Sequence, residues 1–368
     1  MQLPYSDKLD ISFLSKLFDK KSECYKLFWF EAIMIKVVSG KEVVTFDELI
    51  NEMVASAWYM VAEYRLNLGP RDTLEALVHY VYGISSLKSC ERKENIILYL
   101  ENCQDKVVAE KKRTLTKNVP YRLQAPFMDD IRGKNEWDVS EKKLADKINK
   151  EKRLIYYFTL ISGLQSKIHV QKEWCQYISE NQQILRGWIE YNKIMYLQKR
   201  NPSVPGIAFK LYSNQERDLI RVKKYWKAVL EISPMKEIYY GEEIQGNSIS
   251  IDHFVPRSYV AHDELWNLCP TTRSINSKKS NNLPDWNKYF PLLCEIEYNA
   301  YQLVWQYDKL HQIFDKCLDS NVNNEEVRKR LYMAGLEKDV FYSNLEEIIL
   351  PVYSAAEKMG FRKIELAD

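Results

Sequence analysis

An aspartate and a histidine stand side by side at Asp252-His253, and candidate amide ligands and lysines follow them at short range. An imidazole titrates near neutral pH, so His253 has the chemistry of a general base. The side-chain oxygens of Asp252 and Asn276 are hard ligands of the kind that Mg²⁺ or Mn²⁺ prefers. Lys279 adds a cation that could steady an anionic substrate. These residue types would suit hydrolysis assisted by a divalent ion.

Two runs bounded by turn-forming residues must position this chemistry. Residues 248–255 alternate isoleucine with serine and end before a proline, which predicts a strand. A second short strand is expected near residues 265–268. One of the threonines at 271–272 can cap a short helix that Pro284 limits at its other end. The expected unit is therefore strand, loop, strand and helix.

The order of these residues resembles the ββα-metal core of HNH endonucleases, and is closest to the variant found in RNA-guided CRISPR nucleases. The matching pieces are D-H-F-V-P-R-S-Y at 252–259, Asn267, and N-S-K-K-S-N at 276–281. A similar lead-in, I-Y-Y-G-E-E-I, occupies 238–244. The resemblance covers residues 234–284 and says little about the remainder of the chain.

The resemblance implies an endonuclease that hydrolyses DNA phosphodiester bonds and leaves 5′-phosphate and 3′-hydroxyl ends. It implies that His253 activates water and that Asp252 and Asn276 hold the Mg²⁺ or Mn²⁺ ion. Asn267 would brace the loop and orient His253. Lys279 would support the phosphate or the developing anion.

The spacing agrees with part of this assignment and opposes another part. Asn276 and Lys279 are three residues apart, so both can face the strand that bears Asp252. On an ideal strand, however, Asp252 and His253 would point to opposite faces. The resemblance implies that a break just before Pro256 turns both side chains toward one ion.

A purely structural role is the alternative for residues of these types. A lone Asp-His pair usually marks a polar strand end, but its combination with Asn267, Asn276 and Lys279 favours catalysis. His262 lies among small and acidic residues in an expected surface loop, so solvation is favoured over metal binding there.

Length and composition limit the class of protein. A chain of 368 residues with 46% hydrophobic content suggests two or three domains with ample cores. Seven cysteines without a C-x-x-C pair indicate reduced thiols, so no structural zinc is expected. No targeting segment and no long apolar run is evident, which predicts a cytoplasmic protein without a membrane partner.

The net charge of +2 does not by itself indicate a nucleic-acid-binding protein, so local clusters of basic residues are the relevant evidence. Such clusters occur at 111–113 and 142–153, and in the stretch that precedes the core. The stretch before the core could equally be an amphipathic helix that solvates its charges. Arginines of the core could equally form surface salt bridges. The candidate DNA-contacting residues are Arg257, Arg273, Lys278, Arg221, Lys223 and Lys224.

Apolar residues at three- and four-residue intervals predict helices through most of the chain. The expected fold class is mainly α, a multi-helix protein with an embedded small ββα-metal HNH nuclease core. Four regions are expected: an N-terminal helical region at 1–113, a helical region with an extended connector at 114–205, an HNH nuclease domain with a basic lead-in helix at 206–290 (core 234–284), and a C-terminal helical region at 291–368.

Some elements are predicted in more detail. Residues 92–112 and 291–318 are each expected to form one helix. Thr114 to Pro126, with two prolines and alternating apolar residues, predicts a strand or an inter-domain connector. Thr45-Phe46-Asp47-Glu48 predicts a capping box at the start of a helix.

Three roles fit these expectations. The first is a restriction or anti-phage defence nuclease, with a possible partner protein in a defence system. The second is a phage or mobile-element DNA-processing nuclease. The third, from another class, is a non-catalytic nucleic-acid-binding or scaffolding protein with a degenerate HNH core. RNA remains an alternative substrate, because neither the ion nor the base senses a 2′-hydroxyl by itself.

Overall fold

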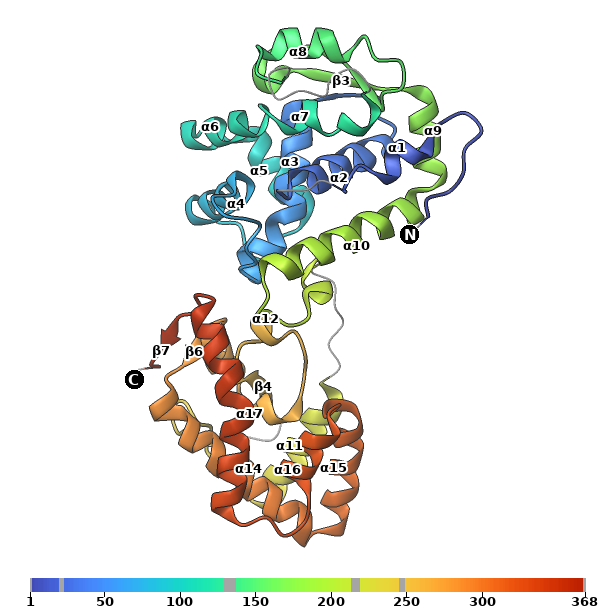
Figure 1. The fold of residues 1–368 in the computed structure, drawn as a ribbon. Helices are drawn as coiled ribbons and strands as arrows, with labels where there is room; N and C mark the ends of the chain where they lie inside the picture. The colour runs from blue at the N-terminus through green and yellow to red at the C-terminus, as the bar shows by residue number, and fades with distance from the viewer. Residues whose placement is uncertain (1, 20–22, 129–136, 213–218, 245–248, 367–368) are drawn as a thin grey trace. The chain divides into compact units, whose positions relative to one another are not determined.

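The structure is a computed structural model that describes residues 2–19, 23–128, 137–212, 219–244 and 249–366 (Figure 1). Its internal contacts divide the chain into two compact units. The N-terminal unit comprises Met1–Pro202 and Lys210–Ser213. The C-terminal unit comprises Ser203–Phe209 and Asn214–Asp368. Helices dominate both units, so the predicted fold class, mainly α, is confirmed.

The described part of the N-terminal unit is built mostly from helices whose apolar faces point inward. Trp29, Trp58, Phe30 and Phe46 are among its fully buried side chains, so these aromatic residues are core residues. The helices are α1 (Ile11–Ser15), α2 (Tyr25–Val38), α3 (Phe46–Trp58), α4 (Thr73–Ile84), α5 (Lys93–Asn102), α6 (Lys106–Leu115), α7 (Val119–Arg122), α8 (Glu141–Ile148), α9 (Lys172–Glu180) and α10 (Gln182–Arg200).

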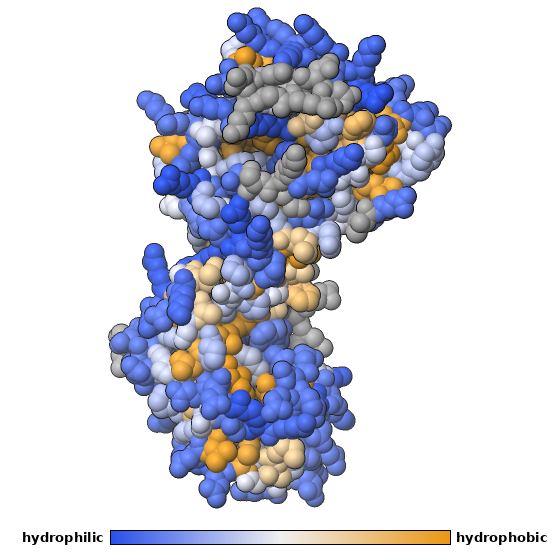
Figure 2. Space-filling view, in the orientation of Figure 1, coloured by the Kyte–Doolittle hydropathy of each residue, from blue (hydrophilic) through white to orange (hydrophobic). Residues whose placement is uncertain are grey.

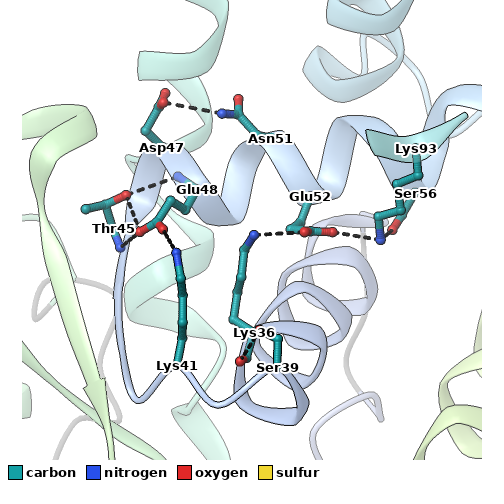
Figure 3. A network of polar contacts seen from close by, with 10 residues as sticks. All are labelled: Lys36, Ser39, Lys41, Thr45, Asp47, Glu48, Asn51, Glu52, Ser56 and Lys93. Atoms are coloured by element: carbon teal, nitrogen blue, oxygen red, sulfur yellow. Dashed lines mark hydrogen bonds and ion pairs between the residues drawn. The ribbon is translucent and has the colours of Figure 1, made fainter. Parts of the chain in front are cut away.

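A polar network fixes the start of α3 and ties it to its neighbours (Figure 3). Thr45 and Glu48 form the predicted capping box, in which each side chain bonds the other residue's backbone N–H. Glu52, whose side chain is 5% exposed, pairs with Lys36 of α2 at 2.8 Å and with Lys93 of α5 at 2.7 Å. One buried carboxylate thus links three helices.

A small antiparallel sheet accompanies these helices, in the order β1-β3-β2. Its strands are β1 (Val43–Thr45), β2 (Tyr156–Leu160) and β3 (Lys167–Val170). Val44 pairs with Ile168, which is more than a hundred residues further along the chain. None of these strands is predicted from the sequence pattern.

Two predictions for this unit are wrong. Thr114 to Pro126 is helical in character, not extended: α6 ends at Leu115, and α7 follows with Pro120 in its first turn. Proline is tolerated there because an N–H in the first turn has no helical partner to lose. The single helix predicted for 92–112 is divided into α5 and α6, because Asp105 caps a new helix start by accepting from two backbone N–H groups.

The C-terminal unit surrounds a two-stranded antiparallel sheet with helices (Figure 1). The predicted first strand and short helix are present, while residue 248 of that strand lies outside the described residues. The elements are α11 (Ile220–Ile232), β4 (Ile249–His253), α12 (Arg257–Val260), β5 (Leu268–Thr272), α13 (Arg273–Lys279), β6 (Leu283–Pro284), α14 (Trp286–Gln306), α15 (Asp308–Asn321), α16 (Glu325–Tyr332), α17 (Lys338–Lys358) and β7 (Lys363–Ile364).

The long helix predicted for 291–318 is also wrong, because two helices, α14 and α15, occupy this stretch. They are separated at Tyr307, whose backbone is extended (φ −125°, ψ 108°). Neither proline nor glycine marks the break in the sequence. The second predicted strand lies slightly later than expected, at Leu268–Thr272 instead of 265–268.

Hydrophilic residues dominate the face of the molecule seen in Figure 2, and hydrophobic ones form small groups between them. This distribution agrees with extensive burial of aliphatic and aromatic side chains in both units. Within the described ranges, no helix has the length and apolar character needed to cross a membrane.

Candidate active site

Strands β4 and β5 and helix α13 form a compact ββα arrangement that carries Asp252, His253 and Asn276. In the sheet, Asp252 pairs with Cys269 and His253 pairs with Leu268. The chain then continues from β5 directly into α13. The indole N–H of Trp226, on α11, donates to the Leu268 carbonyl at 3.2 Å and supports the sheet from outside.

Helix α13 begins at the expected cap and places an amide against β4. The Thr272 hydroxyl accepts from the backbone N–H of Ile275 at 3.4 Å. One turn later, the Asn276 amide nitrogen donates to the Ile251 carbonyl at 2.9 Å and to the Ser250 hydroxyl at 3.1 Å. The candidate amide ligand therefore lies beside the strand that carries the candidate carboxylate.

The Asp252 carboxylate is buried and has two partners of different charge. The Lys279 ammonium lies 3.2 Å from Asp252 Oδ1 and 3.1 Å from Oδ2, and it also donates to the His253 carbonyl at 2.6 Å. The Tyr239 hydroxyl donates to Oδ2 at 2.5 Å. The Asp252 and Lys279 side chains are 4% and 1% exposed, so this ion pair is shielded from water.

Tyr239 is itself held by the C-terminal helices. Its ring centroid lies 5.4 Å from that of Tyr289 on α14. The Tyr289 hydroxyl in turn bonds both the N–H and the carbonyl of Leu366. Burial, followed by the nearby Asp252 charge, raises the pKa of Tyr239 well above its usual range, so the phenol stays protonated and donates.

His253 faces a different carboxylate. Its Nε2 lies 2.8 Å from Asp263 Oδ1, and Arg257 Nε lies 3.5 Å from the same oxygen. When the Asp263 carboxylate is ionised it accepts this hydrogen bond, and Nε2 is the donor. Asp252 and His253 thus have separate partners, as the alternation of a strand requires. Asp263 is a functional candidate that the sequence reasoning missed.

The loop that carries Asp263 is braced by the end of α15 and the residues just after it. The Asn321 amide donates to the Asp263 carbonyl at 2.8 Å, and the Asn323 amide donates to Glu264 at 2.8 Å. The loop begins at Ala261 with a left-handed backbone (φ +57°), a conformation that is uncommon for a residue with a side chain. The position of Asp263 is therefore set by residues 58 or more positions away.

Asn267 is completely buried and braces the turn after β4. Its side chain accepts from the Val255 N–H at 2.8 Å and donates to the Val255 carbonyl at 2.9 Å, as a paired strand would. This is the bracing that the resemblance implied. The side chain placed 2.8 Å from the His253 ring, however, is that of Asp263.

A comparison with known protein families matches the part of the chain that contains this site. Residues 237–285 match the HNH endonuclease family. No curated protein and no solved structure matches the chain. The matched range includes Tyr239, Asp252, His253 and α13, so the resemblance to HNH endonucleases inferred from the sequence is confirmed. An HNH domain indicates a hydrolase that acts on nucleic acid.

The basic residues of the HNH domain fall into two classes. Arg257 is 15% exposed and lies beside Asp263, so its guanidinium forms an ion pair within the domain. Arg273 and Lys278 are exposed on α13, and the Lys278 ammonium lies 5.0 Å from the centre of the Tyr240 ring. The two α13 residues can therefore reach an external anion.

The sequence of helix α11 left open whether its basic residues bind a ligand or only solvate an amphipathic helix. Arg221, Lys223 and Lys224 are exposed, and Arg221 also bonds the Ser320 hydroxyl and the Lys316 carbonyl. The opposite face packs into the unit. Its buried residues are Val222, Tyr225, Trp226, Val229 and Leu230. The helix is amphipathic, and this leaves its charged face available to a ligand.

The donor types of the HNH domain suit a divalent ion, but their arrangement in this structure does not admit one at Asp252. HNH nucleases generally use divalent metal ions. Across the described residues, no group of three or more His, Cys, Asp or Glu side chains is placed to hold a metal. Both Asp252 oxygens are already engaged by Lys279 and Tyr239.

Proposed function

We propose that the C-terminal unit is an endonuclease that hydrolyses DNA phosphodiester bonds to 5′-phosphate and 3′-hydroxyl ends. The observation that carries this proposal is the match of 237–285 to HNH endonucleases, on a ββα unit whose first strand bears Asp252 and His253 and whose helix bears Asn276. Such hydrolysis needs a base for water and positive charge near the phosphate.

His253 is proposed to take the proton from the attacking water. Asp263 supports this role, because its carboxylate accepts the hydrogen bond from Nε2 and stabilises the imidazolium that forms. Asn267 is proposed to act through the turn at Val255, which follows His253 closely in the chain. Asp252 and Asn276 are the residues proposed to hold Mg²⁺ or Mn²⁺, which would supply positive charge to the phosphate.

DNA is proposed to contact the exposed basic residues of α13 and α11. Phosphate contacts come from exposed cations gathered on one surface, and Arg273, Lys278, Lys223 and Lys224 meet the first requirement. RNA is the alternative substrate. A cleavage assay with DNA and RNA strands of equal sequence distinguishes the two substrates.

The biological role proposed is defence against foreign DNA, as a restriction or anti-phage effector. A nuclease attached to a large helical unit suits this role, because the N-terminal unit can recognise a substrate or a partner protein. A phage or mobile-element DNA-processing nuclease is the second candidate. Cutting at one site would favour DNA processing, whereas broad degradation would favour defence.

One observation favours the non-catalytic alternative, a nucleic-acid-binding or scaffolding protein. Asp252 is buried and neutralised by Lys279, so this carboxylate is not open to an external ion. A protein that binds DNA but leaves every phosphodiester intact with Mg²⁺ and with Mn²⁺ would support this alternative.

The test is nicking of supercoiled plasmid DNA by the full-length protein with Mg²⁺ or Mn²⁺. We expect His253→Ala to lower the rate by about 10²-fold or more, because the general base is lost. His169→Ala is the matched control, since His169 is a half-exposed histidine on β3 of the other unit. DNA ligase should reseal the wild-type nicks, as it requires 5′-phosphate and 3′-hydroxyl ends. A His253→Ala protein as active as wild type would overturn the mechanism.

A further inference from the structure

The C-terminal unit holds a groove of about 500 Å³ between α14 and α17, and its lining residues are distinct from the candidate site residues. The two helices pack side by side (Figure 1), with the Trp286 ring 5.0 Å from that of Tyr353 and the Tyr298 ring 5.5 Å from that of Phe341. One wall of the groove comes from the first half of α14, and the other from the first half of α17.

The α14 wall is aromatic and uncharged. The Trp286 and Phe290 rings stack with their centroids 4.1 Å apart and an interplanar angle of 10°. Trp286 is only partly buried, so some of its ring surface is open to a ligand. Cys294 also lines this wall, and burial, followed by the charges of nearby carboxylates, raises its pKa to about 12, so the thiol stays neutral. This wall therefore offers apolar and aromatic surface.

The α17 wall carries two carboxylates whose charge is not balanced. Asp339 and Glu346 are both exposed and both line the groove. Within the described residues, neither carboxylate forms a hydrogen bond or an ion pair, and no lining residue is basic. The neighbouring Lys338 lies 5.3 Å from the centre of the Tyr342 ring, but it pairs with Glu295 at 2.7 Å, so its charge is already neutralised. The groove therefore attracts a cation.

The spacing of the two carboxylates selects the shape of that cation. Asp339 and Glu346 are seven residues apart, so they lie on one face of α17, about 10 Å apart along the helix axis. The hydroxyl of Ser343 lies between them and also lines the groove. A metal ion needs its oxygen ligands within about 2.6 Å, so one ion does not bridge the pair. An extended ligand with a positive charge at each end does.

A proline inside α14 adds a neutral acceptor. Pro291 has no N–H, so the helical hydrogen bond to the Asn287 carbonyl is missing. Both residues line the groove. This carbonyl oxygen can accept a hydrogen bond from an ammonium group, which only donates.

We propose that the groove between α14 and α17 binds an aliphatic polyamine, with one terminal ammonium at Asp339 and the other at Glu346. Its methylene chain lies against Trp286 and Phe290, and aromatic rings also attract alkylammonium groups. Spermidine suits this arrangement, because its outer nitrogens are about as far apart, when the chain is extended, as the two carboxylates along α17. The inference goes beyond the nuclease activity proposed above and does not depend on it.

Isothermal titration calorimetry of the full-length protein with spermidine, without nucleic acid, tests the site. We expect saturable binding that weakens by about tenfold or more in Asp339→Asn/Glu346→Gln, because both ion pairs are lost. The matched control is Asp308→Asn/Asp315→Asn, which removes two exposed carboxylates with the same seven-residue spacing on α15, and it should keep wild-type affinity. Equal weakening in both variants, or no binding by wild type, would overturn the proposal.

Two diamines of equal charge test the two-ended contact. We expect 1,8-diaminooctane to bind several times more tightly than 1,3-diaminopropane, because only the longer chain reaches both carboxylates. In Glu346→Gln this advantage should shrink, because the second ammonium has lost its partner. An advantage of the same size in Glu346→Gln would show that chain length alone favours binding, and would contradict the two-ended contact.

A measurement on the wild-type protein locates the ligand independently of any variant's folding. A carbodiimide couples a bound amine to the carboxylate beside it, and mass spectrometry identifies the modified residue. We expect severalfold more spermidine adduct at Asp339 and Glu346 than at Asp308 and Asp315. Equal modification at the two pairs would overturn the proposal. So would a tetralysine peptide that binds the groove when spermidine does not, because the groove would then belong to a basic protein segment.

Discussion

At the scale of single residues, the histidine of the HNH domain contacts an acid from the loop that follows α12. Asp263 lies 2.8 Å from His253 Nε2, and it is held in place through its own carbonyl by Asn321. A base that must take a proton on one ring nitrogen benefits from a carboxylate that fixes the proton on the other. Asp263 is therefore a positioning residue for the proposed base.

This arrangement predicts a specific kinetic change. Asp263→Asn should lower the kcat of DNA nicking by about 10²-fold while leaving KM close to the wild-type value, because the substrate-facing surface is unchanged. Asp319→Asn, at a well-exposed carboxylate of the same unit, is the matched control and should keep wild-type kcat. A rise in KM with unchanged kcat would assign Asp263 to substrate binding instead.

The sequence could identify part of this site and not the rest. Asp252, His253, Asn276 and Lys279 fall within one short stretch, so spacing alone could place them on one strand and one helix. Asp263 lies in the same stretch, but its contact with His253 depends on a loop braced from α15. The Lys279–Asp252 ion pair joins residues of the predicted set, yet spacing carries no information on whether a lysine faces substrate or carboxylate.

At the scale of elements, α14 carries an ionisable side chain into the core. Glu297 is 4% exposed, and its Oε1 has no hydrogen-bond partner in the described part of the chain. Burial raises the pKa of this carboxyl well above its usual range. The folded state therefore keeps a proton that the unfolded state has lost, so Glu297 makes the protein less stable as pH rises from the unfolded pKa toward the folded one.

Replacement of this side chain should change the pH dependence of stability. Glu297→Met should raise the free energy of unfolding by about 1–3 kcal/mol at pH 8, because an apolar side chain of similar length has no desolvation penalty. The gain in the free energy of unfolding should shrink at pH 5, because part of the unfolded population is then protonated at Glu297 as well. Urea unfolding at both pH values measures this. A larger gain at pH 5 than at pH 8 would contradict the assignment of a neutral buried carboxyl.

Helices were more predictable than strands, and the reason is physical. Helical periodicity is local, and the predicted capping box at Thr45 depends on four consecutive residues. Strand β1 has only three residues, and its partner β3 lies more than a hundred residues away. The break between α14 and α15 at Tyr307 likewise has no local signal, so packing, not propensity, sets it.

At the scale of the whole molecule, charge is distributed locally within a nearly neutral chain. One expected basic cluster, at 111–113, is only partly available to a ligand. Lys112 is buried inside the N-terminal unit and pairs with Asp47 at 2.9 Å. The lysines of α11 remain exposed on the face opposite its buried residues. The DNA surface proposed above lies in the C-terminal unit.

This surface makes a prediction about salt. Lys223→Ala/Lys224→Ala should weaken DNA binding and reduce the slope of log affinity against log salt by about 2, one phosphate contact for each lysine. Lys309→Ala/Lys329→Ala removes the same charge from exposed positions on α15 and α16 and should leave the slope unchanged. Equal effects of the two pairs in fluorescence anisotropy titrations would point to net charge instead of a defined surface.

The most direct test of the account is a crystal of the full-length protein soaked in Mn²⁺ and measured at the manganese absorption edge. We predict one anomalous peak in the HNH domain, beside Asp252 and Asn276. A peak bound elsewhere, or no peak at all, would contradict it.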